Sequence, residues 1–166
     1  MIGFITAIIL FNLVCFTTNK RLTKNQFVHI WTFTIALQAV TETFIDFKYH
    51  GYWYFSKEIN WWVLPAFTIL IPPVNIIFLN WYPFKKTFYK QMLYILCWTI
   101  AITLYEAAAL LPEPWGYFHH SWWSIWYSLL VNPFLLIAVL SYYRWICKIE
   151  SCANLDKNRA CFLKKD

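Results

Sequence analysis

The sequence predicts an all-α integral membrane protein, a bundle of about five transmembrane helices followed by a short basic tail. Three observations lead to this prediction. Hydrophobic residues make up 60% of the 166 residues and charged residues only 13%, which is too apolar for the surface of a soluble domain. Long apolar runs recur along the chain, and basic residues gather at alternate ends of these runs. Lipid is therefore the expected solvent.

The helical spans follow from the length of the apolar runs. A helix that crosses roughly 30 Å of hydrocarbon needs about 20 mostly apolar residues. Five stretches come close to that length, at residues 2–18, 26–47, 61–82, 91–111 and 122–143. Because the connecting loops are short, consecutive spans are expected to be antiparallel neighbours. We predict a transmembrane bundle over residues 1–148 and a basic cytoplasmic tail over residues 149–166.

The basic residues predict the orientation, since Lys and Arg near short spans are retained in the cytoplasm. All but two of the 14 Lys and Arg residues follow the first, third or fifth span, and only Lys48 and Lys57 lie in the other loops. We therefore expect a multi-pass protein of the cell membrane with its N-terminus outside and its C-terminus in the cytoplasm. The net charge of +6 then favours anionic lipid headgroups as partners, and not nucleic acid.

Aromatic residues crowd the predicted outer loops, at residues 49–55, 61–62 and 115–126. Amphipathic rings settle at the depth of the headgroups, so most of them are expected to form interfacial belts. A stacking platform for a ligand is the alternative.

An internal repeat of two helical hairpins after the first helix is also indicated. Trp61, Trp62 and Pro72 recur at one constant spacing as Trp122, Trp123 and Pro133. Two hairpins of the same orientation would form a parallel repeat, as in some transporters. The abundance of tryptophan leaves chance matches as the alternative.

Three acidic residues lie inside the predicted spans. An ionisable group at membrane depth is costly and usually faces a bundle interior or a cavity. Glu42 and Asp46 are four residues apart and share a helix face, and Glu106 is expected at a similar depth in the fourth span. Such carboxylates could bind a cation or share a proton. Helix-to-helix hydrogen bonds at the interface are the structural alternative.

Two spans combine proline with asparagine, in Pro72-Pro73-Val74-Asn75 and in Asn132-Pro133. Proline removes an intrahelical hydrogen bond, and the carbonyl that is set free must bind a neighbour or a ligand. Asn75 and Asn132 therefore join Glu42, Asp46 and Glu106 in the predicted ligand or cation pocket, in the outer half of the bundle. Simple kinks and helix-to-helix contacts are the alternative.

No metal site, cofactor or catalytic residue is predicted. His50, His119 and His120 fall on the same outer side, but they lack a recognised ligand spacing. The soluble-type catalytic motifs are also missing from the sequence. An enzyme is thus less expected than a binding protein, and an intramembrane enzyme that acts on lipid is the third alternative.

Several segments resemble one family of uncharacterised small membrane proteins from spore-forming Gram-positive bacteria. The most specific segment is PPVNIIFLNWYPFKK at residues 72–86, and YILCWT at 94–99, Tyr105-Glu106 and WSIWYS at 123–128 agree with it. The likeness extends over most of the chain from the second span onward. It implies a helical bundle and a position for Glu106, but it implies no activity.

The leading hypothesis is a bacterial inner-membrane protein that binds a small ligand or cation in this polar pocket, for transport or sensing. The alternative is an accessory or scaffold subunit that binds another membrane protein through its aromatic outer face. Five spans are few for a complete transport path, so a homodimer is also a plausible arrangement.

Overall fold

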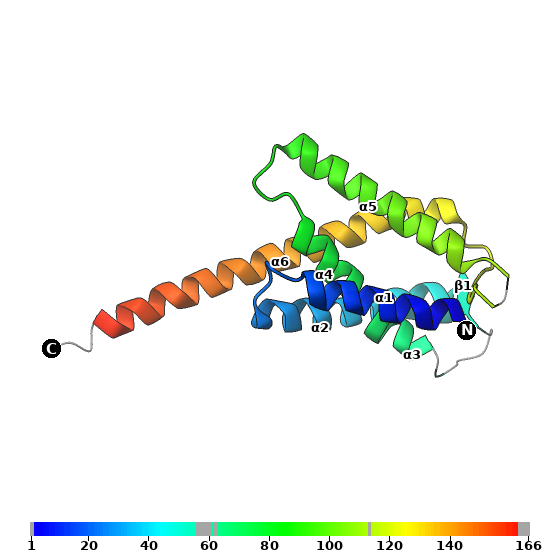
Figure 1. Ribbon diagram of the computed structural model, residues 1–166, viewed down its shortest axis with the longest axis horizontal. Coiled ribbons are helices and arrows are strands. Elements are labelled where there is room, and N and C mark those ends of the chain that lie inside the picture. The colour runs from blue at the N-terminus through cyan, green and yellow to red at the C-terminus, as the bar shows by residue number, and fades with distance from the viewer. Residues whose placement is uncertain (1, 56–60, 62, 113, 163–166) are drawn as a thin grey trace.

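The computed structural model describes residues 2–55, 61, 63–112 and 114–162, with the backbone alone at Asp46, Phe47 and residues 153–162. The chain is mostly helical, which confirms the all-α part of the predicted class (Figure 1). In chain order the elements are α1 (Ile2–Thr18), α2 (Lys24–Glu42), the π-helical η1 (Thr43–Lys48), β1 (Tyr52–Tyr54), α3 (Val63–Pro65), the π-helical η2 (Ala66–Leu70), α4 (Ile71–Trp81), α5 (Phe88–Ala109), β2 (Phe118–His120) and α6 (Ile125–Phe162).

Three helical stretches in the described part of the chain are long and apolar enough to cross a membrane. They are Val63–Trp81, Phe88–Ala109 and Ile125–Cys152, while α1 is apolar but has only 17 residues. α2 is outside this group because polar residues such as Gln26, Gln38 and Glu42 interrupt its apolar face. Three of the five predicted spans thus have suitable helices, and the spans at residues 2–18 and 26–47 stay predictions.

The two ends of the bundle differ. β1, β2 and the start of α1 lie at one end, here called the ribbon end, and the loops at residues 19–23 and 82–87 lie at the other, here called the basic end (Figure 1). α6 is continuous through Pro133, and it extends past the other helices beyond the basic end. The predicted tail at residues 149–166 therefore begins as a continuation of this helix.

The basic end is held by polar contacts to the loop between α1 and α2. Asn80 accepts hydrogen bonds on Oδ1 from the backbone N–H groups of Lys20 and Arg21, both at 3.1 Å, and donates from Nδ2 to the Thr18 carbonyl at 2.8 Å. α2 then starts with a capping box, in which Thr23 and Gln26 each accept a hydrogen bond from the backbone N–H of the other. These contacts satisfy backbone groups that the helix ends leave open.

The paired prolines explain the irregular segment before α4. Pro72 and Pro73 have no N–H, so the carbonyls four residues earlier lose their intrahelical donors. The chain forms the π-helical η2 at this place, and the Ile71 N–H donates to Ala66 in the wider turn. The carbonyl of Ile69 receives a hydrogen bond from Asn12 Nδ2 on α1 at 3.0 Å. A neighbouring helix thus satisfies a carbonyl that proline has set free.

This contact gives a first prediction. Asn12→Leu should lower the free energy of unfolding by about 1 to 2 kcal/mol, because the Ile69 carbonyl would lose its donor. Denaturation of the purified protein in mixed micelles, followed by circular dichroism, measures the loss. Thr17→Val on the same helix is the control, since Thr17 bonds only carbonyls of its own helix. Equal midpoints for the Asn12 and Thr17 variants would contradict the assignment.

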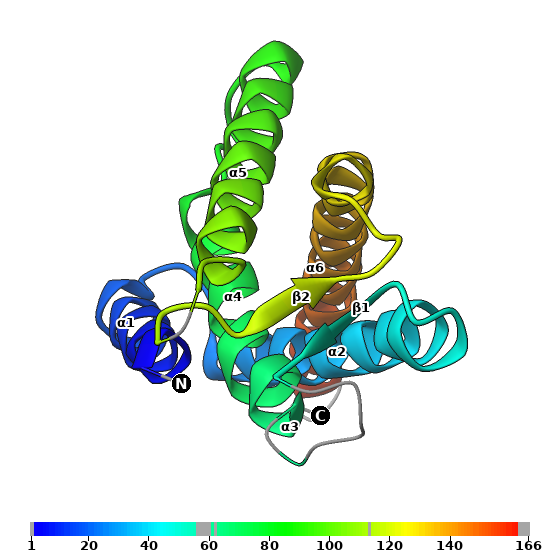
Figure 2. The same cartoon turned by 90° about the vertical axis from the view of Figure 1, so that its right-hand side faces the viewer.

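The ribbon end is closed by a two-stranded antiparallel ribbon that sequence reasoning did not foresee. β1 and β2 pair in the register Tyr52 with His120, Trp53 with His119 and Tyr54 with Phe118. Figure 2 shows the ribbon across the end of the bundle that faces the viewer. Because strand side chains alternate, Trp53 and His119 share one face and stack on each other with ring centroids 5.9 Å apart. Tyr52 and Phe118 are buried on the opposite face, toward the helices.

The buried side chains form two clusters. The larger cluster joins residues of α1, α2, α4, α5 and α6, and includes Ile30, Ile76, Leu79 and Leu136. The smaller cluster lies at the ribbon end, where Phe4 and Leu70 pack with Tyr117 and the inner face of the ribbon.

Candidate functional site

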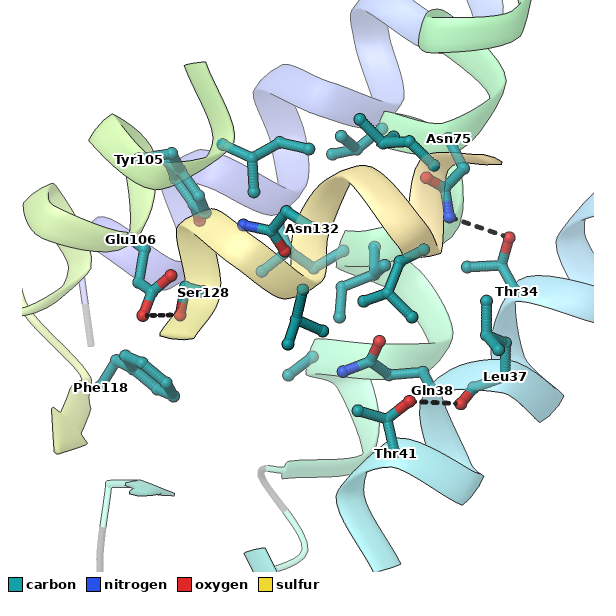
Figure 3. A pocket seen from close by; sticks show the side chains of 18 of the residues that line it. Thr34, Leu37, Gln38, Thr41, Asn75, Tyr105, Glu106, Phe118, Ser128 and Asn132 are labelled. Atoms are coloured by element: carbon teal, nitrogen blue, oxygen red, sulfur yellow. Dashed lines mark hydrogen bonds between the residues drawn. The ribbon is translucent and has the colours of Figure 1, made fainter. Parts of the chain in front are cut away.

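A cavity of about 280 Å³ lies among the helices on the bundle side of the ribbon. Its walls are largely apolar, but four helices each contribute a polar side chain: Gln38 from α2, Asn75 from α4, Glu106 from α5 and Asn132 from α6. Figure 3 shows Gln38, Glu106 and Asn132 on three different helices around the cavity, with Glu106 turned toward Ser128. An apolar cavity with a few convergent polar groups is the usual form of a small-molecule site.

The five residues of the predicted pocket occupy different places. Glu106, Asn75 and Asn132 line the cavity. Glu42 is buried, with 1% of its surface exposed, but it is not among the described residues that form the wall. Asp46 belongs to η1, and its side chain is outside the described residues. The fold therefore brings three of the five together, with Glu42 one layer behind them.

The hydrogen bonds that the described residues make to Glu106 hold only one of its two carboxylate oxygens. Its Oε1 accepts a hydrogen bond from Ser128 Oγ at 2.7 Å and lies 2.9 Å from His120 Nε2. The Ser128 oxygen in turn accepts from Trp123 Nε1 at 2.8 Å. Both contacts that reach Glu106 from the described residues end on Oε1, which leaves Oε2 with no hydrogen bond from that part of the chain. α5, α6 and β2 thus fix a carboxylate whose second oxygen can still accept.

Asn132 lines the cavity with a buried donor group. Its Nδ2 atom is buried, and no hydrogen-bond partner for it exists among the residues that the structure describes. Leaving a buried N–H group unsatisfied costs about 1 to 3 kcal/mol. Native proteins usually avoid this, so each such group calls for an explanation. A bound molecule with an acceptor near Asn132 would provide one.

Asn75, by contrast, already has a protein partner. Its Nδ2 donates to Thr34 Oγ1 on α2 at 3.2 Å, as Figure 3 shows. Thr34 is buried, with 1% of its surface exposed. This hydrogen bond joins α2 to α4 beside the cavity, so Asn75 serves at least the helix-to-helix contact.

Glu42 is a second buried carboxylate, which lies behind the side chains that line the cavity. Its Oε1 accepts from Gln38 Nε2 at 2.6 Å and from the Tyr54 hydroxyl at 3.3 Å, and both donors line the cavity. Burial and the neighbouring Glu42 carboxylate raise the pKa of Tyr54 well above its usual range. The Tyr54 phenol therefore stays protonated and available to donate to Glu42.

The predicted pocket did not include Gln38, Ser128, His120 or Trp123, although the sequence already placed His120 and Trp123 in the aromatic outer loop. A signal for two of them was present: Gln38 is four residues before Glu42, and Ser128 is four residues before Asn132, so each pair shares one helix face. Polar residues at this spacing in an apolar segment indicate a polar stripe toward the interior. His120 and Trp123 had no such signal, because their positions depend on the pairing of two distant loops.

Among the described residues, no three His, Cys, Asp or Glu side chains gather in a way that could hold a metal ion. His120 contacts Glu106, whereas His119 stacks on Trp53 at the other face of the ribbon. The predicted outer histidines are thus divided between the two faces.

Comparisons with known protein families, with curated proteins and with solved structures find no match to this chain. The resemblance of residues 72–86 to small membrane proteins of spore-forming bacteria stays a prediction. The geometry of the cavity is the basis for a functional proposal.

Proposed function

We propose that the protein is a multi-pass membrane protein that binds a small molecule in this cavity, for transport or sensing. The single observation that carries the proposal is the buried Asn132 amide, which lines the cavity without an acceptor in the described chain. The volume of about 280 Å³ is nearly twice that of the engineered cavity of about 150 Å³ that holds benzene. The size suits a small molecule and not a polypeptide segment.

The surface of the bundle supports a membrane environment. Large apolar side chains are exposed along one face of α1, α5 and α6, among them Ile9, Leu13, Leu96, Leu104, Leu130 and Phe134. Exposed apolar area of this extent favours contact with lipid. We propose five spans, with the ribbon end outside the cell and the basic end in the cytoplasm, since Lys and Arg gather at the basic end.

Contacts at the ribbon support the proposed repeat of two hairpins, α2–α4 and α5–α6. In each hairpin a carboxylate contacts the strand that follows it: Glu42 accepts from Tyr54, and Glu106 contacts His120. A half-turn about the central pair of the ribbon, Trp53 and His119, exchanges the positions of Tyr54 and His120. The two contacts are therefore equivalent under the symmetry of the ribbon.

The proposal is tested by ligand-dependent stability of the purified protein in detergent, across a panel of cations and small metabolites. A molecule that binds only the folded state stabilises it by about 2.7 kcal/mol at a hundredfold excess over Kd. We expect at least one compound to raise the unfolding temperature of the wild type. Asn132→Leu should abolish the rise, because leucine fills the space and offers no donor.

Glu150→Gln and Asn25→Leu are matched controls, because these residues contact each other at the basic end, away from the cavity. Both variants should keep the full response. A flat response of the wild type to the whole panel would overturn the binding proposal. The accessory-subunit alternative would then be examined by crosslinking in the native membrane.

A further inference from the structure

The ribbon end of the cavity is lined by five aromatic residues, here called the aromatic cap: Tyr52, Tyr54, Tyr117, Phe118 and Trp123. Their rings form one connected group. The Phe118 ring centroid lies 4.9 Å from that of Tyr52 and 5.0 Å from that of Tyr54, and Tyr52 also contacts Trp123 at 5.9 Å. The ribbon and the residues on either side of β2 therefore form a continuous aromatic surface at this end of the cavity.

The polar groups of three members of the cap already form hydrogen bonds within the protein. The Tyr54 hydroxyl donates to Glu42, the Tyr117 hydroxyl lies 2.6 Å from that of Tyr105, and Trp123 Nε1 donates to Ser128. Burial, together with Tyr105, raises the pKa of the Tyr117 phenol, so this residue also stays neutral. What these residues offer a ligand is the ring itself, which carries negative π density on its face.

The charged side chain among the described residues of the wall is acidic. Glu106 lines the cavity beside the cap, and neither Lys nor Arg occurs among the described residues of the lining. The nearby Lys48 lies over the rings of Phe44 and Tyr49 instead. His120 contacts Oε1 of Glu106 only, and Oε2 remains able to accept. The site therefore combines a carboxylate with aromatic rings and favours a positive charge.

The remainder of the wall limits which cation fits. Ca²⁺ takes six to eight oxygen ligands, and Mg²⁺ demands a near-ideal octahedron, whereas the wall of the cavity is largely aliphatic and aromatic, with Leu70, Ile102 and Val131 among its residues. An ammonium group with organic substituents needs no such oxygen shell. It binds over aromatic faces through cation–π attraction, as in aromatic cages for quaternary ammonium ions.

We propose that the ligand is an organic ammonium ion, held between the Glu106 carboxylate and the aromatic cap, with its apolar body along the aliphatic walls. This inference rests on the proposed function, because it assigns a ligand class to the same cavity. Glu106 supplies the countercharge, the cap supplies π faces, and Asn132 donates to an acceptor elsewhere on the ligand.

The test compares two probes of the same shape, benzyltrimethylammonium and its neutral isostere neopentylbenzene, in which carbon replaces the charged nitrogen. Calorimetric titration into the full-length protein in detergent, with empty micelles as the blank, gives both affinities. We expect the cation to bind the wild type about tenfold more tightly, since both cation–π contacts and the carboxylate favour it. Glu106→Gln and Phe118→Leu should each reduce this ratio.

Glu150→Gln and Phe16→Leu are the matched controls, since Glu150 lies at the basic end and Phe16 is exposed on α1, and both should keep the wild-type ratio. Equal binding of the two probes would overturn the ammonium assignment while supporting a small-molecule cavity. Binding of neither probe would overturn the ammonium assignment, and the wider panel would still decide the proposed function. The comparison on the wild type alone decides the inference, so a variant that fails to fold does not affect it.

Discussion

Asn80→Leu is expected to lower the free energy of unfolding by about 3 to 5 kcal/mol, because three hydrogen bonds of one side chain are lost at once. Two of them come from the backbone N–H groups of Lys20 and Arg21, and the third goes to the Thr18 carbonyl. The Asn80 side chain is buried, with 9% exposed, so water cannot easily replace these partners. Denaturation in mixed micelles measures the loss.

Asn80→Asp is the informative control. It keeps an oxygen for the two N–H donors and replaces the donor to Thr18 with a second acceptor oxygen, so its loss should still be below that of the leucine variant. An equal loss in both would mean that the Thr18 contact carries the effect. No loss in either variant would refute the role of Asn80 as the link between α4 and the first loop.

Gly116→Ala is expected to cost about 3 kcal/mol or more, since an inserted methyl group in a tight space costs about 1 to 3 kcal/mol even where side chains can move. Here the new Cβ would lie only 1.6 Å from the Leu111 carbonyl oxygen and 3.0 Å from that of Ala109. Both obstacles are backbone atoms, so the loop must shift as a whole. Tyr117 and Phe118, which follow directly and line the cavity, would be displaced with the loop.

Gly51→Ala is the matched control at the other loop. Its Cβ would lie 3.1 Å from a side-chain methyl of Ile45 and 3.3 Å from the Ile45 carbonyl oxygen. These contacts need a shift of only a few tenths of an ångström, and we expect a loss below about 1 kcal/mol. Unfolding in mixed micelles compares the two variants, and near-ultraviolet circular dichroism reports on the aromatic cap. A Gly116→Ala protein with wild-type stability and spectrum would show that the loop does not pass this close to the end of α5.

The helices were predictable because apolar runs are local signals. The stretch at residues 2–18 coincides with α1, and the stretch at 91–111 overlaps α5 at Phe88–Ala109. The end of α6 was not predictable in the same way. The apolar run indicates that the predicted span ends at about residue 143, but a helix satisfies its own backbone and can continue beyond an apolar run. α6 therefore runs on to Phe162.

The site was predictable in part, for a similar reason. A carboxylate such as Glu106 inside an apolar run is visible in the sequence, as is an asparagine beside a proline. The layer that separates Glu42 from the cavity was visible only in part, because Gln38 lies four residues away on the same helix, whereas Tyr54 lies on the ribbon. The register of β1 with β2 depends on contacts between loops that are far apart in the sequence, and no local pattern specifies it.

The ribbon also imposes an order on biosynthesis. β1 is made early, but its partner β2 emerges only after α4 and α5 have been synthesised. Until then β1 has no partner strand to pair with along its edge. Glu106 likewise has neither His120 nor Ser128 as a neighbour. The cavity can therefore close only after the ribosome has passed the start of α6, and a nascent chain that stalls earlier holds an incomplete cavity.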